Sequence, residues 1–345
     1  MNNWFDFAAF SQNAFGAAIQ QAPLGFIDIG ARGGVHPLVE PIAGSTQVLA
    51  FEADAEECSR LQKLLHGNTQ WAHIDLAPIA LGASEADAEL HLLSTETNHS
   101  LLPPDNEFTH RYNMEKWREI ETVPVKTRSL DSIVYGDYPN NQYYGEFIKL
   151  DTQGTEYEIL LGAERTLRER CVAVVSEVAF FPIYKGQRLF SDVESLLRKQ
   201  GFSFYGFTDM AYRSKRLIDK TKQKSNERIF YADAVFFKDP LPGGGRRISL
   251  NDRQKMVLIL CAMLLSYYDF ALELLDALED ENHTKKIMKS FILDVCRCDP
   301  KELTQQVESL LERMKSNETN AMIELGDFVD KAYSNSNYNE FSPQP

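Results

Sequence analysis

The chain has 345 residues, of which 43% are hydrophobic, so it is long enough to bury one large core or two smaller ones. It carries 50 acidic and 36 basic residues, for a formal net charge of −14. This acidic balance argues against nucleic acids and anionic membranes as partners, because both repel a negatively charged surface.

The composition also indicates where the protein works. The first twenty residues contain no Lys or Arg, so we expect no secretory signal with a basic start. The longest uncharged apolar run, Met256–Leu265, is too short to cross a bilayer and indicates a buried helix. The five cysteines follow no zinc spacing and indicate free thiols. We therefore expect a cytoplasmic protein without a transmembrane segment.

After a helical extension expected over residues 1–24, short apolar runs alternate with helical patterns. Continuous apolar runs are typical of parallel strands that helices cover on both faces. The expected strands are Gly25–Ile29, Gln47–Phe51, Phe147–Leu150 and Val172–Glu177. Asp54 is expected to cap the helix that bears Cys58, and Thr155-x-x-Glu158 and Ser191-x-x-Glu194 predict capping boxes for two more.

The first of these strands ends in an acid followed by glycines. Asp28 is followed by Gly30, Gly33 and Gly34, and glycine lets a ligand approach the main chain closely. Glu52 ends the next apolar run, where a carboxylate can accept hydrogen bonds from a ribose. Together these features indicate a nucleotide-like cofactor; the alternative is a tight turn and a solvated acid.

Residues 76–130 interrupt the alternation. Ala88–Leu93 and Val123–Lys126 have the composition of strands, and the stretch between them has no strong period. Long irregular insertions in compact domains are usually functional or disordered, and we expect this one to cover the cofactor pocket.

The end of the alternating region has a different pattern. Phe202–Phe207 and Ile229–Phe237 predict an antiparallel pair, because only a polar loop separates them. The proline- and glycine-rich stretch 240–245 predicts a domain boundary. We expect a main domain over 25–240, a helical region over 246–333 and a disordered polar tail over 334–345.

One block resembles a known family. Lys149-Leu150-Asp151-Thr152-Gln153-Gly154-Thr155-Glu156, followed by an apolar helix ending in Gly162-Ala163, is similar to the signature of the FkbM-type methyltransferases. Asn98-x-Ser100-Leu101 and Val123–Asp131 resemble two further elements of that family, and the resemblance spans roughly residues 25–240. The chain departs from the family pattern at Arg32, where Asn is usual, and at Gln153, where Glu is common.

The resemblance implies a fold and a cofactor. The expected fold is α/β: a doubly wound, mostly parallel seven-stranded sheet closed by an antiparallel hairpin, as in class I methyltransferases that use S-adenosylmethionine (SAM). Gly30 and Gly34 would admit the methionine end of SAM. A helix starting near Val35, with Arg32, would meet the carboxylate of SAM.

Further site residues follow from the same resemblance. Glu52 would hold the ribose, and residues 79–82 would pass the adenine. Asp28 would either orient the glycine loop or contact the amino group of SAM.

Catalytic candidates gather at the same sheet edge. Asp151 and Glu177 each end an apolar run, so their carboxylates are expected side by side. The pair would hold a divalent cation or act as a general base, or would merely cap a turn and face solvent. His99 and His110 in the insertion would deprotonate a hydroxyl, or would simply be solvated.

The resemblance implies transfer of a methyl group to a hydroxyl of a sugar, polysaccharide or secondary metabolite. The alternative is a non-catalytic interaction module acting through the C-terminal helices, which would also allow a homodimer. A nicotinamide dehydrogenase shares the glycine turn, but fits poorly with the block around Asp151.

Overall fold

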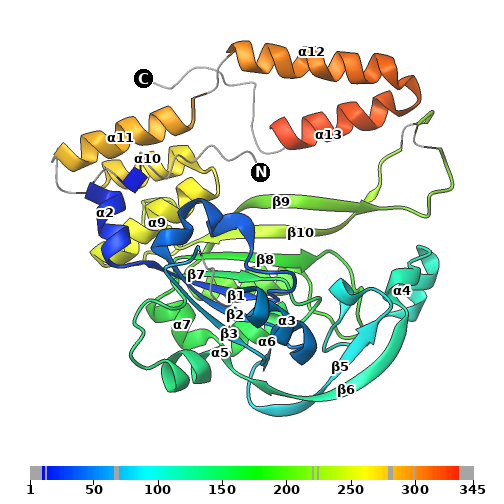
Figure 1. Ribbon diagram of the computed structural model, residues 1–345, viewed down its shortest axis with the longest axis horizontal. Coiled ribbons are helices and arrows are strands. Elements are labelled where there is room, and N and C mark those ends of the chain that lie inside the picture. Colours follow the sequence, from blue (N-terminus) through cyan, green and yellow to red (C-terminus); the bar gives the residue numbers. More distant parts are fainter. Residues whose placement is uncertain are drawn as a thin grey trace. The chain divides into compact units, whose positions relative to one another are not determined.

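The computed structural model describes residues 10–11, 14–65, 70–219, 221–223, 225–278, 283–297 and 300–333 (Figure 1). Their contacts group them into two compact units. The first unit takes its residues from 1–211 and 230–296, and the second from 212–229 and 297–345.

A mixed sheet of seven strands forms the centre of the first unit, in the order β3-β2-β1-β7-β8-β10-β9. Strands β3, β2, β1, β7 and β8 run parallel, and β10 runs antiparallel to β8. The expected doubly wound sheet closed by the β9–β10 hairpin is therefore confirmed. The strands are β1 (Leu24–Ile29), β2 (Thr46–Phe51), β3 (His73–Ala77), β7 (Phe147–Leu150), β8 (Ala173–Ala179), β9 (Ser203–Arg213) and β10 (Arg228–Phe237).

Neighbouring strand residues point to opposite faces of the sheet and enter two separate cores. Phe26 and Phe147 pack into one core with the first group of helices, and Ile27 and Ile148 pack into the other core with the second group. The first group comprises α2 (Ala14–Gln21), η1 (Pro37–Ser45), α9 (Asp252–Leu264), α10 (Tyr268–Asp276) and α11 (His283–Val295). The second comprises α5 (Leu130–Ser132), η4 (Ile133–Asp137), α6 (Glu156–Leu161), α7 (Glu164–Glu169) and α8 (Phe190–Lys199).

The irregular insertion contains a second, three-stranded sheet in the order β4-β6-β5. A cluster of buried side chains, including Tyr112 and Leu93 from the insertion and Phe181 and Tyr184 from beyond β8, attaches it to the main sheet. The elements of the insertion are β4 (Ala80–Leu81), β5 (Ala86–Leu93), η2 (Glu96–Asn98), α4 (Asn106–Arg111), η3 (Glu115–Trp117) and β6 (Glu119–Arg128).

Of the three predicted helix starts, one is confirmed and two are wrong. Asp54 Oδ1 accepts the N–H of Glu56 and Glu57 at the start of α3 (Ala55–Leu65). Thr155 makes no side-chain cap to α6. Helix α8 begins at Phe190, so Ser191 lies inside its first turn, and Asp192 accepts the N–H of Leu189 instead.

Helix α9 confirms the buried helix expected from the apolar run. Its residues Val257 to Met263 are buried in the core on one face of the sheet. Arg253, in its first turn, pairs with Glu146 at 2.7 Å and donates to the carbonyls of Ala22 and Pro23. Helices α9 to α11 thus belong to the compact unit that holds the sheet, and a boundary at 240–246 stays a prediction.

The second unit contains α12 (Pro300–Ser316), η5 (Glu318–Asn320) and α13 (Ala321–Tyr333). Arg313 of α12 pairs with Glu324 of α13 at 3.0 Å. The expected disordered tail at 334–345 and most of the first ten residues lie outside the described part of the chain.

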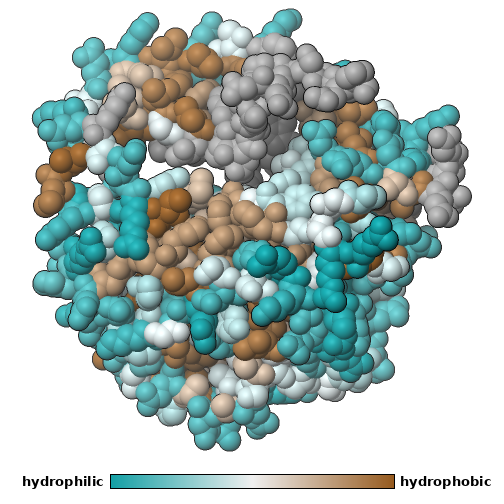
Figure 2. All heavy atoms as spheres, turned by 180° about the vertical axis from the view of Figure 1, so that it is seen from behind, coloured by the Kyte–Doolittle hydropathy of each residue, from teal (hydrophilic) through white to brown (hydrophobic). Residues whose placement is uncertain are grey.

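Hydrophilic residues cover most of the face seen in Figure 2, with hydrophobic residues gathered in separate patches. Cys58, Cys171, Cys261 and Cys296 are free, and Cys298 lies outside the described residues. None of the described helices combines the length and the apolar character that a bilayer span requires. The cytoplasmic location stays a prediction.

Candidate functional site

A cavity of about 180 Å³ opens at the carboxyl ends of β1, β2 and β7. Gly30, Glu52 and Asp151 line it from three adjacent strand ends. The other lining residues come from the sheet domain and from a segment of the insertion: Ile29, Arg32, Phe51, Ala53, residues 79–81, Leu90, residues 96–97, residues 99–101, residues 152–153, Thr155 and Ile159. Residues 96–97 and 99–101 of the insertion line the cavity, and the expectation that the insertion covers a cofactor pocket stays a prediction.

The glycine turn brings β1 and β7 into close contact. A Cβ atom at Gly30 would lie 1.9 Å from the carbonyl oxygen of Asp151, and φ of Gly30 is +88°. The N–H groups of Gly30 and Ala31 both donate to the carbonyl of Phe51. Gly34, with φ of +128°, does not line the cavity.

Asp28 lies beneath this turn and is buried. Its Oδ2 accepts the N–H of His36 at 2.7 Å, so the carboxylate orients the glycine loop. Burial raises the pKa of Asp28 to about 6. A helix was expected near Val35; the structure instead has the 3-10 helix η1 from Pro37, capped by His36 Nδ1 accepting from Leu38 N–H.

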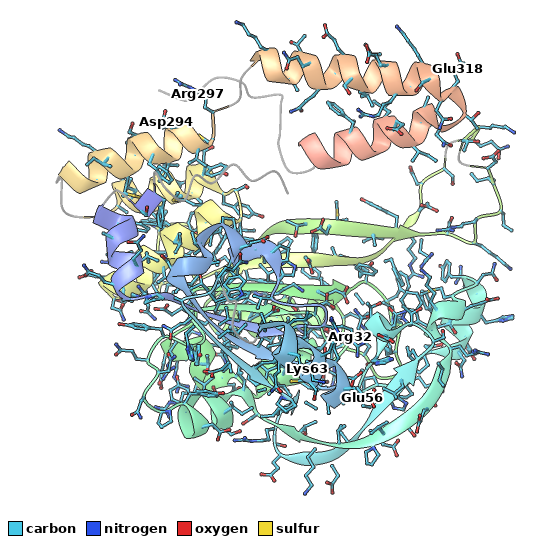
Figure 3. The ribbon with its side chains drawn as sticks, in the orientation of Figure 1. Arg32, Glu56, Lys63, Asp294, Arg297 and Glu318 are labelled. Carbon is cyan, nitrogen blue, oxygen red and sulfur yellow. The ribbon has the colours of Figure 1, made fainter. Side chains whose placement is uncertain are left out.

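Arg32 lies between α3 and the insertion, where it meets several acids (Figure 3). Its Nη2 donates to Asp54 Oδ2 at 2.5 Å, its Nη1 donates to Glu96 Oε2 at 3.1 Å, and its Nε lies 3.9 Å from Glu52 Oε2. Three carboxylates therefore already surround this guanidinium. Arg32 also lines the cavity, and its expected role at a cofactor carboxylate stays a prediction.

Glu52 is buried at the end of β2. Its Oε1 accepts the N–H of Asp54 at 2.8 Å. Burial raises the pKa of Glu52, and the Asp54 N–H and the Arg32 charge partly oppose that shift. The carboxylate thus faces the cavity with one oxygen engaged by the backbone.

Asp151 and Glu177 are brought together as expected, through Gln153. The side-chain nitrogen of Gln153 donates to Asp151 Oδ1 at 3.0 Å and to Glu177 Oε2 at 3.3 Å. Glu177 lies inside β8 rather than at its end, because β8 continues to Ala179. Burial raises the pKa of Glu177 well above its usual value, and the charge of Asp151 adds to that rise.

A buried lysine faces these acids. Lys149 Nζ lies 3.5 Å from Asp151 Oδ2 and 3.9 Å from Asp233 Oδ1. Burial lowers the pKa of Lys149, but the charges of Asp151, Asp233 and Asp28 outweigh burial and raise it. Burial also raises the pKa of Asp233 to about 6. Lys149 thus balances acids from three strands.

The two candidate histidines lie in different surroundings. His99 lines the cavity, with Nδ1 3.5 Å from Arg32 Nη2 and 3.9 Å from Asp54 Oδ2. Burial, and then the charge of Arg32, lower the pKa of His99. His110 is exposed on α4 and does not line the cavity.

The sequence analysis gave no structural role to Tyr184 or Lys149, which hold the site together. Tyr184 is fully buried beyond β8, and its hydroxyl lies 3.0 Å from both Gln153 Oε1 and the carbonyl oxygen of Asn98, to either of which it can donate its one hydrogen. The sequence pattern could have indicated a role for Lys149. A lysine inside a four-residue buried strand needs a charged partner.

A metal site was one expectation for Asp151 and Glu177. Across the described parts of the chain, no three His, Cys, Asp or Glu side chains group in a way that would hold a metal ion. The two carboxylates instead share the amide of Gln153.

A mostly parallel seven-stranded sheet with an antiparallel β10, and a cavity at the carboxyl ends of its central strands, defines a class I methyltransferase fold. The chain belongs to the FkbM methyltransferase family: the family model described as Methyltransferase FkbM domain matches residues 28–204, more than half of its length. A comparison with curated proteins found no match.

Solved structures give a weaker likeness. The crystal structure of methyltransferase FkbM from Methylobacillus flagellatus KT is 14% identical with a TM-score of 0.36; the match covers 66% of this chain and 47% of that one. TrmK from M. capricolum, solved with S-adenosylhomocysteine (SAH), is 8% identical with a TM-score of 0.32, over 81% of this chain and 93% of that one. The chain thus spans about half the length of the first structure, and we draw no conclusion on activity from either.

Proposed function

We propose that this protein transfers a methyl group from SAM to a hydroxyl of a sugar, polysaccharide or secondary metabolite. Its family membership supports methyl transfer. The observation that carries the proposal is a cavity that Gly30, Glu52 and Asp151 line together. Ligands of open α/β sheets bind outside the carboxyl ends of the strands, where these three residues lie.

The residues around the cavity fit an adenosyl group. Glu52 Oε2 lies 3.9 Å from Arg32 Nε, which leaves this oxygen able to accept hydrogen bonds from ribose hydroxyls. Phe51, Ile79 and Leu81 add apolar wall suited to the flat face of adenine. Gly30 and Glu52 are therefore the proposed cofactor residues, whereas Asp28 acts through the loop that it holds.

SAM, when bound, supplies a methyl group made electrophilic by its sulfonium. Asp151 is the proposed general base, because its side chain is 41% exposed and lines the cavity. Gln153 engages Oδ1 of Asp151, so Oδ2 is the atom that would receive the hydroxyl proton. Lys149 Nζ lies 3.5 Å from Oδ2 and pairs with this carboxylate.

His99 is the second proposed proton acceptor. Its lowered pKa keeps the ring neutral near pH 7, as a base requires. Glu177 positions Asp151 through Gln153. His110 lies outside the cavity and takes no part in this proposal.

Calorimetry with SAM, SAH and NAD tests the cofactor. We expect SAM and SAH to bind and NAD not to bind. Glu52→Gln should weaken SAM binding by roughly tenfold, because a ribose hydroxyl then loses a charged hydrogen-bond acceptor. Glu56→Gln is the matched control: Glu56 is exposed on the first turn of α3 and should leave the affinity unchanged (Figure 3). NAD binding without SAM binding would instead favour a dehydrogenase.

Transfer of a radiolabelled methyl group to sugars and other alcohols tests the reaction. We expect labelled product from at least one hydroxyl acceptor and from no amine or thiol analogue of it. Asp151→Asn should lower kcat by about a hundredfold, the size expected for loss of a general base. A wild-type rate in that variant would rule out Asp151 as the base.

A second candidate function is a SAM-binding interaction module without catalysis. Helices α12 and α13 favour it, since they expose apolar side chains of a kind that form interfaces. These are Val307, Leu311, Met322, Ile323, Leu325 and Val329, which are 38% to 48% exposed. The same helices would support a homodimer. SAM binding without transfer to any acceptor would favour the module.

A further inference from the structure

One wall of the cavity comes from the insertion instead of the sheet. Residues 96–97 and 99–101 line it from this side. The segment contains η2 and two residues that are hydrogen-bonded to the main sheet domain, Asn98 and Ser100. How the segment is held therefore decides what can enter the cavity.

The two ends of this wall are held with different strength. Ser100 is buried, and its hydroxyl donates to the carbonyl of Gln153 at 2.7 Å; Asn98 is buried and accepts from Tyr184. Glu96, at the other end, is 81% exposed and is held by its ion pair with Arg32 at 3.1 Å. Exposed ion pairs are weak, whereas buried hydrogen bonds are costly to leave unmade. The Glu96 end is the one that can open.

Arg32 is the fixed half of this ion pair. Its side chain is 16% exposed, and its Nη2 donates to Asp54 Oδ2 at 2.5 Å. Figure 3 labels Arg32 beside α3. Glu52 lies 3.9 Å from its Nε. When Glu96 leaves, two carboxylates still neutralise the guanidinium, so opening exposes no unpaired cation.

Arg32 and Glu96 both line the cavity, so their ion pair joins the sheet side of its wall to the insertion side. We propose that the Arg32–Glu96 ion pair is a clasp that opens to admit the adenosyl cofactor and closes again over it. Glu96 moves with residues 96–97, and Arg32 stays on Asp54. The inference rests on the proposed function, because it takes the cofactor to be SAM.

Hydrogen exchange in the protein without ligand tests the clasp itself. The amide groups of Asn98 and His99 donate to the carbonyls of Thr95 and Glu96, so they report opening of η2. Glu96→Gln should raise their exchange about fivefold, the weight of one exposed ion pair. Glu56→Gln removes the same charge from an exposed position on α3 and should leave exchange in this segment unchanged. Unchanged exchange in Glu96→Gln would overturn the clasp.

Stopped-flow binding of SAH tests entry. SAH has no net charge, so removing a protein charge does not change its long-range attraction. A clasp that must open for both entry and exit predicts that Glu96→Gln raises the association and dissociation rates together, each about fivefold, with Kd nearly unchanged. A wall contact without gating would change the dissociation rate alone and would overturn the inference.

The two experiments separate the two claims. Faster exchange in Glu96→Gln together with an unchanged association rate rejects gating and leaves the proposed function intact. Absence of SAH binding to the wild-type protein and to both variants rejects the proposed function, and the gating role falls with it.

Discussion

Asp28 shows how a single carboxylate couples the glycine loop to pH. It is buried, holds the N–H of His36, and its pKa is raised to about 6 by burial, from about 4 in an unfolded chain. The folded protein therefore binds this proton more tightly than the unfolded chain does. The stability that protonated Asp28 contributes to the folded state is fully present below about pH 4 and is lost as the pH rises through 6.

Asp28→Asn should remove this pH-dependent loss of stability, because an amide keeps an oxygen for the His36 N–H and does not ionise. Relative to the wild type, the variant should gain on the order of 2 kcal/mol in unfolding free energy between pH 4 and pH 7. Urea unfolding at four pH values measures it. Asp294→Asn, at an exposed position on α11, should show no such gain. Parallel pH profiles for Asp28→Asn and the wild type would contradict the prediction.

At this scale the sequence indicated where the candidate residues lie better than it indicated what they contact. Asp28, Glu52 and Asp151 each follow or end an apolar run, so their place at the sheet edge could be predicted. The partners of Arg32 could not, since Glu96 lies 64 residues away and is brought near by the insertion. The same holds for Gln153 and Tyr184, which are 31 residues apart.

Strand β1 and the turn after it depend on glycine for two separable reasons. Gly30 and Gly33 both have positive φ, +88° and +85°. A Cβ atom at Gly30 would also lie 1.9 Å from the Asp151 carbonyl, whereas one at Gly33 would meet no atom within 4 Å. A side chain at Gly30 would therefore clash with the end of β7, whereas one at Gly33 would not.

Gly30→Ala should lower the unfolding free energy by about 3 kcal/mol or more, because the β1 and β7 ends must move apart. Gly33→Ala should cost only about 1 kcal/mol, the price of the backbone conformation. Urea unfolding of both variants measures the difference. Equal losses would mean that the Gly30–Asp151 approach does not contribute.

The strands that are buried on both sides were predictable, whereas one of the two edge strands of the main sheet was not. Continuous apolar runs marked β1, β2, β7 and β8 because both faces of each strand are covered. Strand β3 was missed, since it is an edge strand with mostly half-exposed residues. At α6, Glu156 accepts the N–H groups of Thr152 and Gly154 in place of the capping box expected from Thr155. At α8, the helix begins one residue before the expected cap, Ser191.

At the scale of the whole molecule, the glycine-rich stretch 240–245 predicts a boundary just before α9. The contacts instead place α9 in the same compact unit as the sheet. Helix α9, which follows that stretch, has seven buried residues between Val257 and Met263. Burying side chains of this kind contributes roughly 1.5 to 3 kcal/mol each, so α9 is worth about as much as the whole net stability of a domain. The sheet should not fold without it.

Two truncated chains test this. A chain ending at residue 245 should aggregate or unfold, because it exposes the core face that α9 covers and leaves the buried Glu146 without Arg253. A chain ending at residue 296 keeps α9 to α11, and it should unfold cooperatively and bind SAH as the full chain does.

Comparison of the full chain with the chain ending at residue 296 also tests self-association. If α12 and α13 form the interface of a homodimer, light scattering should give twice the monomer mass for the full chain and the monomer mass for residues 1–296. A cooperative transition in the chain ending at 245 would show that the fold closes without α9. In that event, the buried residues of α9 would stabilise an independent unit instead of the sheet, and the boundary at 240–246 would be a true division of the molecule.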